Sequence, residues 1–425
     1  MIEIASFQIN ILGLIITIIL FVLLVIKKIE PVPILALTSI FINIPLFNYK
    51  PWTFGFQIFF FFAIILILLS LKNIFEAFKN KNFFILILLI SIFILIVLLS
   101  LFLAYKNNYE VLVLQPPDIP NFSSYKIYRF SRLNITQFLY LLFYILLFLS
   151  IIVSKFDLTK TFKYFFLGIN INFLFQIYEI LLNIFHKPLP IFFNNLSFLN
   201  ETIQILYLKD LNIYRFSGLI PSSSLLGIYL TIALFLALFF KDIFKYNWRR
   251  LLQVFIIFSS FLCSISSTFV LGALIVFLIC FYRFKTPFLI LLIIILITIF
   301  FKLSNRETIE IRFQYFLSSM MIFLKYPIFG IGWGSHFADF FILANTGILG
   351  FLSFLSIFIF MIVKTLKLKN EKGYNLMTIG LLTLFLTGII WNGININILW
   401  IILGIWGREV ISNKNAHIFN NNTDL

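Results

Sequence analysis

A histidine stands on a glycine-rich turn directly before a long apolar run. The stretch KYPIFGIGWGSHFADFFILANTGILG, residues 325–350, contains Gly330, Gly332, Gly334 and His336. An imidazole that faces water has a pKa close to neutrality, which suits a general base that removes a proton from an attacking hydroxyl. A structural histidine that caps the following helix is the competing interpretation. Packing of small residues between helices is an alternative explanation of the glycines.

An arginine, a glycine, a proline and three serines follow one another earlier in the chain. In IYRFSGLIPSSSLLG, residues 213–227, Arg215 and Gly218 precede Pro221 and Ser222. Proline is favoured in the first turn of a helix, and the backbone donors at a helix start attract anions, as a guanidinium does. The pattern predicts an anion site at the outer membrane face. An ordinary interfacial arginine before a serine-capped helix is the simpler interpretation.

A second arginine-bearing stretch leads into the glycine-rich turn. In NRETIEIRFQYFLSSMMIFLKYPIFGIGWG, residues 305–334, apolar side chains recur at helical spacing, and Arg306 and Arg312 lie near the start. This pattern predicts an amphipathic helix on the outer face of a membrane that ends at Pro327.

Two carboxylates are further candidates for a site. Asp339 follows His336 by three residues and would orient the imidazole if that turn is helical, although a solvated loop carboxylate is the simpler interpretation. Glu179 is expected inside a membrane span, about two helical turns from its outer edge. Ionisable residues at such depth mark functional sites by default, so Glu179 is a candidate for an acceptor groove.

The elements that position these residues are membrane helices. The chain has 425 residues, of which 62% are hydrophobic and 11% charged, and its mean hydropathy is +1.07. Apolar runs near 20 residues cross a bilayer as helices, which satisfy their own backbone groups in lipid. We therefore predict an all-α polytopic membrane protein, a single integral membrane domain over residues 1–425, with about 12–13 transmembrane helices. The run at 251–282 is too long for one span and is expected to form two.

Loop charges predict how the spans are oriented. Lysines and arginines crowd into short connections, which the positive-inside rule assigns to the cytoplasm. Three long segments are then left outside, at 105–134, 186–220 and 303–341, and all the candidate loop residues fall within or beside them. The net charge of +16 is a topology signal and an attraction to anionic lipid, so it requires no nucleic-acid partner.

Several kinds of chemistry have no sequence signal. Cys263 and Cys280 lie in apolar runs without metal-ligand spacing, and neither a phosphate-binding P-loop nor an Asp-x-Asp pair occurs. We therefore expect no metal and no cofactor. A reaction outside the membrane has no nucleotide supply, so its substrate must arrive already activated, as a lipid-linked pyrophosphate does.

In combination, these motifs resemble the O-antigen polymerase and O-antigen ligase family of bacterial inner-membrane glycosyltransferases. Arg312, Pro327, GIGWG, His336 and NTGILG follow the order of the late signature of that family. Arg215, Gly218 and Pro221 are similar to its earlier element. The direct resemblance covers residues 214–352. The chain departs from the family at Phe337, where an asparagine is common, and at SISSTF, residues 264–269, where many members carry a serine and an arginine. Arg306 or Lys302 would take the place of that arginine.

The resemblance implies an inverting, metal-independent transferase on the periplasmic side of a bacterial inner membrane. Arg215, Arg312 and Arg306 would bind the pyrophosphate, and His336 would be the base. The partners would be a polyprenyl-pyrophosphate-linked oligosaccharide, membrane lipid and a chain-length regulator. Polymerisation of lipid-linked repeats is favoured over ligation to a lipid or protein acceptor, because only 24 positions (336 − 312) separate Arg312 from His336. A lipid-linked-glycan flippase or other transporter is the alternative class, but it should carry several charges inside its spans.

Overall fold

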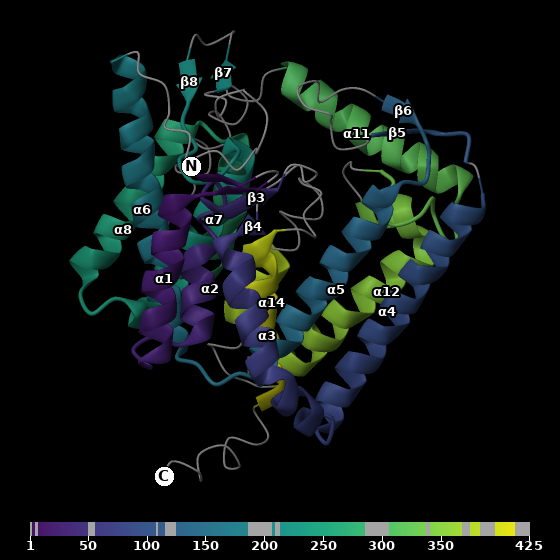
Figure 1. Ribbon diagram of the computed structural model, residues 1–425, viewed down its shortest axis with the longest axis horizontal. Helices are drawn as coiled ribbons and strands as arrows, with labels where there is room; N and C mark the ends of the chain where they lie inside the picture. Colours follow the sequence, from purple (N-terminus) through teal and green to yellow (C-terminus); the bar gives the residue numbers. More distant parts are fainter. Residues whose placement is uncertain are drawn as a thin grey trace. The chain divides into compact units, whose positions relative to one another are not determined.

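The computed structural model describes residues 2–4, 7–49, 56–107, 109–114, 125–185, 206–208, 213–284, 306–336, 341–367, 375–382 and 396–412. The chain is mostly helical, as predicted (Figure 1). It divides into two compact units, and each unit is built from two separate segments of the chain. Unit 1 comprises Met1–Leu69 and Lys155–Ser304, and unit 2 comprises Ser70–Ser154 and Asn305–Leu425.

Five of the described helices are long and apolar enough to cross a membrane. They are α3 (Ile58–Ala77), α4 (Lys81–Lys106), α5 (Arg132–Val153), α6 (Leu158–Ile184) and α12 (Phe341–Leu366). Shorter apolar helices are α1 (Ile11–Val25), α7 (Ser223–Phe239) and the Thr268–Cys280 part of α9 (Ser267–Phe284). These helices indicate a multi-pass membrane protein. The count of 12–13 spans stays a prediction, because apolar runs such as 286–301 lie outside the described residues.

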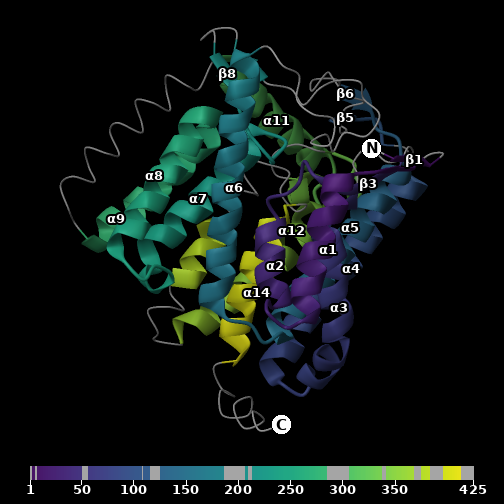
Figure 2. The same ribbon diagram turned by 60° about the vertical axis from the view of Figure 1, so that its left-hand side comes forward.

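Unit 1 is organised around α7. This helix is hydrophobic all round, and its residues from Leu225 to Ala237 are all buried, as expected for a helix with neighbours on every side. It packs against α6, α8 (Asn247–Ser264) and α9, and the last two lie beside it in Figure 2. The predicted division of the 251–282 run is confirmed, because α8 ends at Ile265, which has a left-handed backbone with φ 46°.

Short strands were not predicted from the sequence, and the structure contains several. In unit 1, β1 (Ile2–Ile4), β2 (Phe7–Ile9), β3 (Pro45–Tyr49) and β4 (Phe56–Gln57) form one antiparallel sheet in chain order. Two hairpins are formed by β7 (Leu206–Leu208) with β8 (Ile213–Arg215) in unit 1, and by β5 (Leu112–Leu114) with β6 (Tyr125–Ile127) in unit 2. Both hairpins fall in the long segments predicted to lie outside the membrane.

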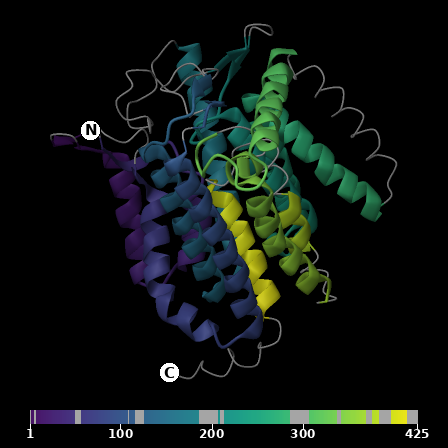
Figure 3. The ribbon, with the colours of Figure 1, turned by 90° about the vertical axis from the view of Figure 1, so that its right-hand side faces the viewer.

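Unit 2 consists of two packed helix pairs. Helix α4 packs on α12, and α5 packs on α14 (Asn397–Ser412), drawn in yellow in Figure 3. Gly404 and Gly407 allow the close approach of α14, since a Cβ at either position would meet Ile151 or Ile152 of α5. Helix α11 (Arg306–Lys325) contacts α12, and in Figure 1 it lies across the end of that helix. The predicted helix before Pro327 is therefore confirmed.

Each unit has a lysine-bearing end and an opposite end. In unit 2, Lys364 near the end of α12 donates to Asn82 Oδ1 at the start of α4, at 2.7 Å. In unit 1, Lys160 at the start of α6 lies 3.7 Å from Glu30, which follows α1. Neighbouring helices thus bring lysines together at one end, while Lys106 of α4 and Lys325 of α11 lie at the other end of unit 2, so the orientation from the positive-inside rule stays a prediction. The glycine-containing turns described next lie at the other end of α6 and of α12.

Candidate functional site

Three polar side chains of α6 hold a short turn before α7, which we name the upstream turn (Phe216–Ile220). Glu179 Oε2 accepts a hydrogen bond from Gly218 N at 2.9 Å, and Asn172 Oδ1 accepts one from Leu219 N at 2.8 Å. Gln176 Nε2 donates to Phe216 O at 2.7 Å. Residues spaced by four and three positions share one face of a helix, so α6 presents all three to the turn.

The other side of the upstream turn is paired as well. Asn43, which follows α2 (Pro31–Thr38), donates from Nδ2 to Gly218 O at 3.1 Å and from its backbone N to Leu219 O at 2.8 Å. Phe216 N donates to Cys263 O of α8 at 3.0 Å. Gly218 has φ +68°, and a Cβ there would lie 2.8 Å from both oxygens of Asn172. Glycine is required at this position for backbone conformation and for space.

Helix α7 begins with a serine cap, as the simpler interpretation of that stretch expected. Ser222 is the N-cap, and its Oγ accepts from Leu225 N at 3.2 Å. The placement of Pro221 in the first helical turn is wrong, because the helix starts at Ser223 and the proline precedes the cap. The Ser222 hydroxyl accepts the hydrogen bond at the start of the helix. Pro221 therefore lies one residue before the cap, outside the first helical turn.

The structure describes where the three candidate arginines lie along the backbone. Arg215 ends β8 and pairs in register with Leu206 of β7 in unit 1. Arg306 and Arg312 lie on α11 in unit 2. For all three the structure describes the backbone and not the side chain, so their contact with a pyrophosphate stays a prediction. Asp339 lies outside the described residues.

The predicted glycine-rich turn before α12 is confirmed, and we name it the downstream turn (Tyr326–His336). Gly330, Gly332 and Gly334 all have left-handed backbones, with φ 64°, 99° and 72°. These conformations favour glycine strongly. At Gly330 a Cβ would also lie within 2.6 Å of Thr346 N, an immovable backbone atom. Helix packing alone therefore does not account for the glycines.

The downstream turn pairs with the start of α12, which is broken at Gly347 (φ 62°, ψ −164°). Ile331 N donates to Ala344 O at 3.2 Å, and Gly332 N donates to Asn345 O at 2.9 Å. Beyond the break, Ile348 N donates to Pro327 O at 2.8 Å. A backbone carbonyl thus caps the continuing helix. The alternative in which His336 caps it is wrong.

Two asparagines fix the rest of the downstream turn. Asn345 Oδ1 accepts from Ser335 N at 3.0 Å and from His336 N at 2.9 Å, while its Nδ2 donates to His336 O at 2.8 Å and to Phe341 O at 2.7 Å. Asn134 of α5 donates from Nδ2 to Trp333 O and to Ser335 Oγ, both at 2.8 Å. Asn345 therefore uses both oxygen lone pairs and both amide protons.

His336 does not face water, contrary to the expectation from sequence. Its exposed fraction is 0%, because the downstream turn folds it against α11. Burial lowers the pKa of the imidazole to about 3. His336 is therefore neutral near pH 7, and a group with so low a pKa is a weaker base than one poised near neutrality. The buried position favours a structural role, and the general-base role stays a prediction.

The partner of His336 on α11 indicates which ring nitrogen carries the proton. Ser318 Oγ lies 3.2 Å from His336 Nε2 and donates its single proton to Tyr315 O at 2.8 Å. Both contacts are hydrogen bonds only if Nε2 carries the imidazole proton and donates to the serine. Ser318 therefore favours the Nε2-protonated tautomer.

Tyrosines cover the outer side of the downstream turn. Tyr109 and Tyr128 belong to a buried cluster with Ile322 of α11 and Ile331, and Tyr326 packs on it. Tyr128 OH donates to Ala104 O at 3.1 Å, and burial raises the pKa of this tyrosine to about 12. The phenol is therefore protonated at neutral pH and serves as a donor.

Sequence reasoning missed the amides that hold the two turns. These residues are Asn43, Asn134, Asn172, Gln176 and Asn345. All of them are buried. The available signal was an amide side chain within or beside an apolar run, where an unpaired polar group is costly. Such a residue must find a partner, but the sequence alone does not say which one.

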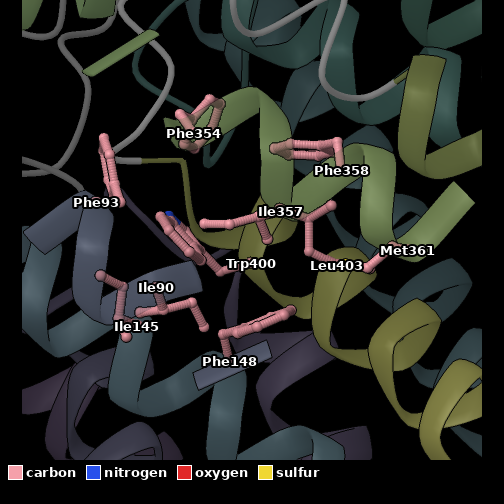
Figure 4. A pocket seen from close by; sticks show the side chains of 10 residues that line it. All are labelled: Ile90, Phe93, Ile145, Phe148, Phe354, Ile357, Phe358, Met361, Trp400 and Leu403. Atoms are coloured by element: carbon pink, nitrogen blue, oxygen red, sulfur yellow. The ribbon is translucent and has the colours of Figure 1, made fainter. Parts of the chain in front are cut away.

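A small pocket in unit 2 has no polar lining. Its ten lining side chains come from α4, α5, α12 and α14 and include Phe93, Phe354 and Trp400 (Figure 4). Ligand sites combine apolar walls with a few polar groups that orient the ligand. This pocket offers no such group among its lining side chains other than the indole of Trp400, so we assign it no ligand.

Comparison with protein-family models gives no match, and comparison with curated proteins finds no similar sequence. The structure therefore shows a helical, multi-pass membrane protein in which buried side chains hold two turns in place.

Proposed function

We propose that the chain is a bacterial inner-membrane glycosyltransferase that polymerises surface-polysaccharide repeats, the activity of the O-antigen polymerase family that its motifs resemble. The donor would be a glycan on polyprenyl pyrophosphate, and the acceptor a hydroxyl of a second lipid-linked repeat. The reaction would take place on the periplasmic side, at the ends of the units that carry the two turns. A chain-length regulator is a candidate partner.

The observation that carries this proposal is the surface of α11. Leu317, Met321 and Leu324 are 41%, 65% and 76% exposed and follow one another at helical spacing. The opposite face, with Ser318 and Ile322, is buried in unit 2. An exposed apolar stripe on a helix at the end of a membrane bundle fits a lipid interface. This helix also carries Arg306 and Arg312, the arginines that we propose bind the pyrophosphate of a lipid carrier.

The chemistry requires cations more than any other group. The acceptor oxygen attacks the anomeric carbon and forms the glycosidic bond, while the bond from that carbon to the phosphate oxygen breaks. The bonding electrons leave with the polyprenyl pyrophosphate, and the acceptor proton passes to a base. Guanidinium groups bind phosphate oxygens in a bidentate manner and stabilise the charge that develops on the leaving group.

The polar groups of α6 support an enzyme over a transporter. A flippase is expected to line its passage with polar groups that contact the substrate. Here Gln176 and Glu179 bond to the backbone of the upstream turn. They are therefore committed to holding a loop in place. Ligation of finished polymer to another acceptor differs only in the acceptor, so the assay below includes it.

Reconstitution in lipid vesicles with a polyprenyl-pyrophosphate-linked repeat tests the proposal. A polymerase yields a ladder of products that differ by one repeat, and it releases polyprenyl pyrophosphate. Transfer only when a separate lipid or protein acceptor is added would indicate a ligase. Movement of the intact donor across the bilayer without a new glycosidic bond would indicate a flippase. Either result would overturn polymerisation as the function.

Arginine variants test the role of the cations in the same assay. Arg312→Lys and Arg215→Lys keep the charge and lose the planar fork, so each should lower the transfer rate by about tenfold or more. Arg249→Lys is the matched control, because Arg249 lies at the lysine-bearing end of unit 1, over the rings of Tyr246 and Trp248. Wild-type rates in Arg312→Ala and Arg215→Ala would remove the arginines from the proposed site.

A further inference from the structure

We propose that Glu179 is a positioning residue that fixes the upstream turn, and through it the segment from Arg215 to the start of α7, by accepting a hydrogen bond and not by moving a proton. The proposal rests on the proposed function only for its effect on transfer. Its structural part, that Glu179 holds the backbone of the turn, stands independently of any activity.

The first argument is the convergence of hydrogen bonds on two residues. Gly218 and Leu219 offer two N–H groups and two carbonyls. Glu179 and Asn172 accept from the two N–H groups, and Asn43 donates to both carbonyls. All four backbone groups of this dipeptide are therefore paired with residues distant in sequence. A backbone held in this way has one conformation available to it.

The second argument is the position of the turn in the chain. Arg215 precedes Gly218 by three residues, and Ser222, the cap of α7, follows it by four. Gly218 adopts a left-handed backbone that reverses the chain between the two. A shift of the Gly218 amide therefore changes the direction in which the chain leaves β8 and the point at which it enters α7. Glu179 therefore acts on both ends through its hydrogen bond to Gly218.

The third argument is the chemistry of the bond. Glu179 is 5% exposed on an apolar helix, where a carboxylate is costly to bury. A hydrogen bond from an N–H to a carboxylate is about twice as strong as one between neutral groups, which offsets part of that cost. A backbone amide neither takes up nor releases a proton near neutral pH. The Gly218 contact through Oε2 therefore makes Glu179 an anchor for the turn.

Three substitutions at Glu179 distinguish the length of its side chain from its charge. Glu179→Gln keeps an oxygen at the same length and removes the proton-transfer capacity. Glu179→Asp keeps the carboxylate and is too short by one methylene to reach Gly218 without backbone movement. Glu179→Ala removes both. If Glu179 positions the turn, the glutamine variant should transfer glycan within about threefold of wild type, and the aspartate and alanine variants should lose about tenfold or more.

Hydrogen–deuterium exchange of the peptide that contains Gly218 and Leu219 gives a readout independent of activity. We expect protection in wild type and Glu179→Gln, and faster exchange in Glu179→Asp and Glu179→Ala. Glu76→Ala, which removes an exposed carboxylate paired with Lys72, is the control that should change neither measurement.

The outcomes are distinct. A glutamine variant that keeps the amides protected but loses transfer while the aspartate variant retains it would overturn the proposal in favour of proton transfer. Unchanged exchange in the aspartate and alanine variants would overturn the positioning role itself. If wild type shows no transferase activity, the proposed function fails, and the exchange data still decide whether Glu179 holds the turn. If the alanine variant does not fold, the glutamine and aspartate pair still decides it.

Discussion

The upstream turn in unit 1 and the downstream turn in unit 2 meet the same structural requirement in different ways. Each precedes a helix, each contains glycine in a left-handed conformation, and each is held by buried side chains distant in sequence. The upstream turn contains a single glycine, Gly218. Four hydrogen bonds from Asn43, Asn172 and Glu179 hold the backbone of Gly218 and Leu219. In the downstream turn Gly330 and the break at Gly347 fit the chain closely against α12, while Gly332 and Gly334 fit it against α4 and α5.

The two turns also differ in how completely their amides are used. The Asn345 side chain uses all its hydrogen-bonding capacity, with three bonds to the downstream turn and one to Phe341 O of α12. In unit 1, Asn172 Nδ2 is buried and has no hydrogen-bond partner among the described residues. The downstream turn thus depends on steric fit and on an asparagine whose side-chain hydrogen-bonding groups are all used. The upstream turn depends on a carboxylate and on an asparagine that has one donor without a partner among the described residues. The two should fail under different substitutions.

The largest expected effect is steric. Gly330→Ala adds a Cβ within 2.6 Å of backbone atoms of the α12 segment and forces a left-handed alanine. The strain and the overpacking together should cost roughly 2–5 kcal/mol of the free energy of unfolding. Thermal unfolding of the purified protein in detergent measures this cost. Gly334→Ala is the control, since it shares the left-handed backbone but its Cβ would lie 2.8 Å from a side-chain atom of Gln137 and not from backbone; a larger loss there would contradict the steric account.

The next effect contrasts the two asparagines directly. Asn345→Ala leaves the N–H group of His336 without its acceptor, leaves Ser335 N only the longer bond to Gly332 O, and removes both donors to His336 O and Phe341 O, so it should cost about 3 kcal/mol. Asn172→Ala leaves only Leu219 N without its acceptor, and it also removes a buried donor that has no partner among the described residues. The free energy of unfolding should therefore fall by about 1 kcal/mol. Chemical or thermal unfolding of both variants gives the two values. Equal losses in the free energy of unfolding would mean that the number of hydrogen bonds made by each asparagine does not distinguish the two turns.

A third effect depends on pH and is confined to the downstream turn. Because burial lowers the pKa of His336 to about 3, the unfolded chain binds a proton below pH 6.5 that the folded chain does not. Stability contributed by the neutral imidazole is fully present above pH 6.5 and is lost as the pH falls, by about 2 kcal/mol between pH 6.5 and 5. His336→Gln should remove most of the fall in melting temperature between pH 6.5 and 5, and Asn172→Ala should not. Parallel pH profiles for wild type and His336→Gln would argue against the buried position.

The smallest expected effect concerns the tyrosine cover of the downstream turn. Tyr128→Phe removes the phenol that donates to Ala104 O and keeps the ring in its buried cluster. The hydrogen bond to Ala104 O and the contact of the phenol with Ser335 are lost, so the free energy of unfolding should fall by about 1 kcal/mol. Tyr105→Phe, on an exposed ring, is the matched control and should change stability little. A Tyr128→Phe protein as stable as wild type would show that the cluster holds the turn through packing alone.

The parts of this fold that follow from sequence are those set by local pattern. The helical class, the division at Ile265, the amphipathic helix before Pro327 and the glycine turn after it all rest on periodicity and on the conformational preferences of glycine and proline. The short strands were missed because hairpin pairing depends on neighbours that a local pattern does not contain.

The site was less accessible to prediction for the same reason. Glu179 was recognised because a carboxylate in an apolar run is conspicuous, but its partner, the Gly218 amide, is 39 positions away. His336 was expected in water because it lies on a polar-looking loop, whereas Asn345 and Ser318 draw it inside. Burial of a loop residue is a tertiary property, and it reverses the chemistry that the residue type suggests.

The break in α12 at Gly347 also sets an order of assembly. A ribosome makes residues 326–336 before it makes α12, and the carbonyl of Pro327 and the N–H groups of Ser335 and His336 receive their partners from Ile348 and Asn345. Asn134 and Ser100, which also contact this region, are made much earlier. Asn345 and Ile348 therefore complete the downstream turn only once the start of α12 has been made. A chain halted before residue 345 would hold this turn without the hydrogen bonds that these two residues supply.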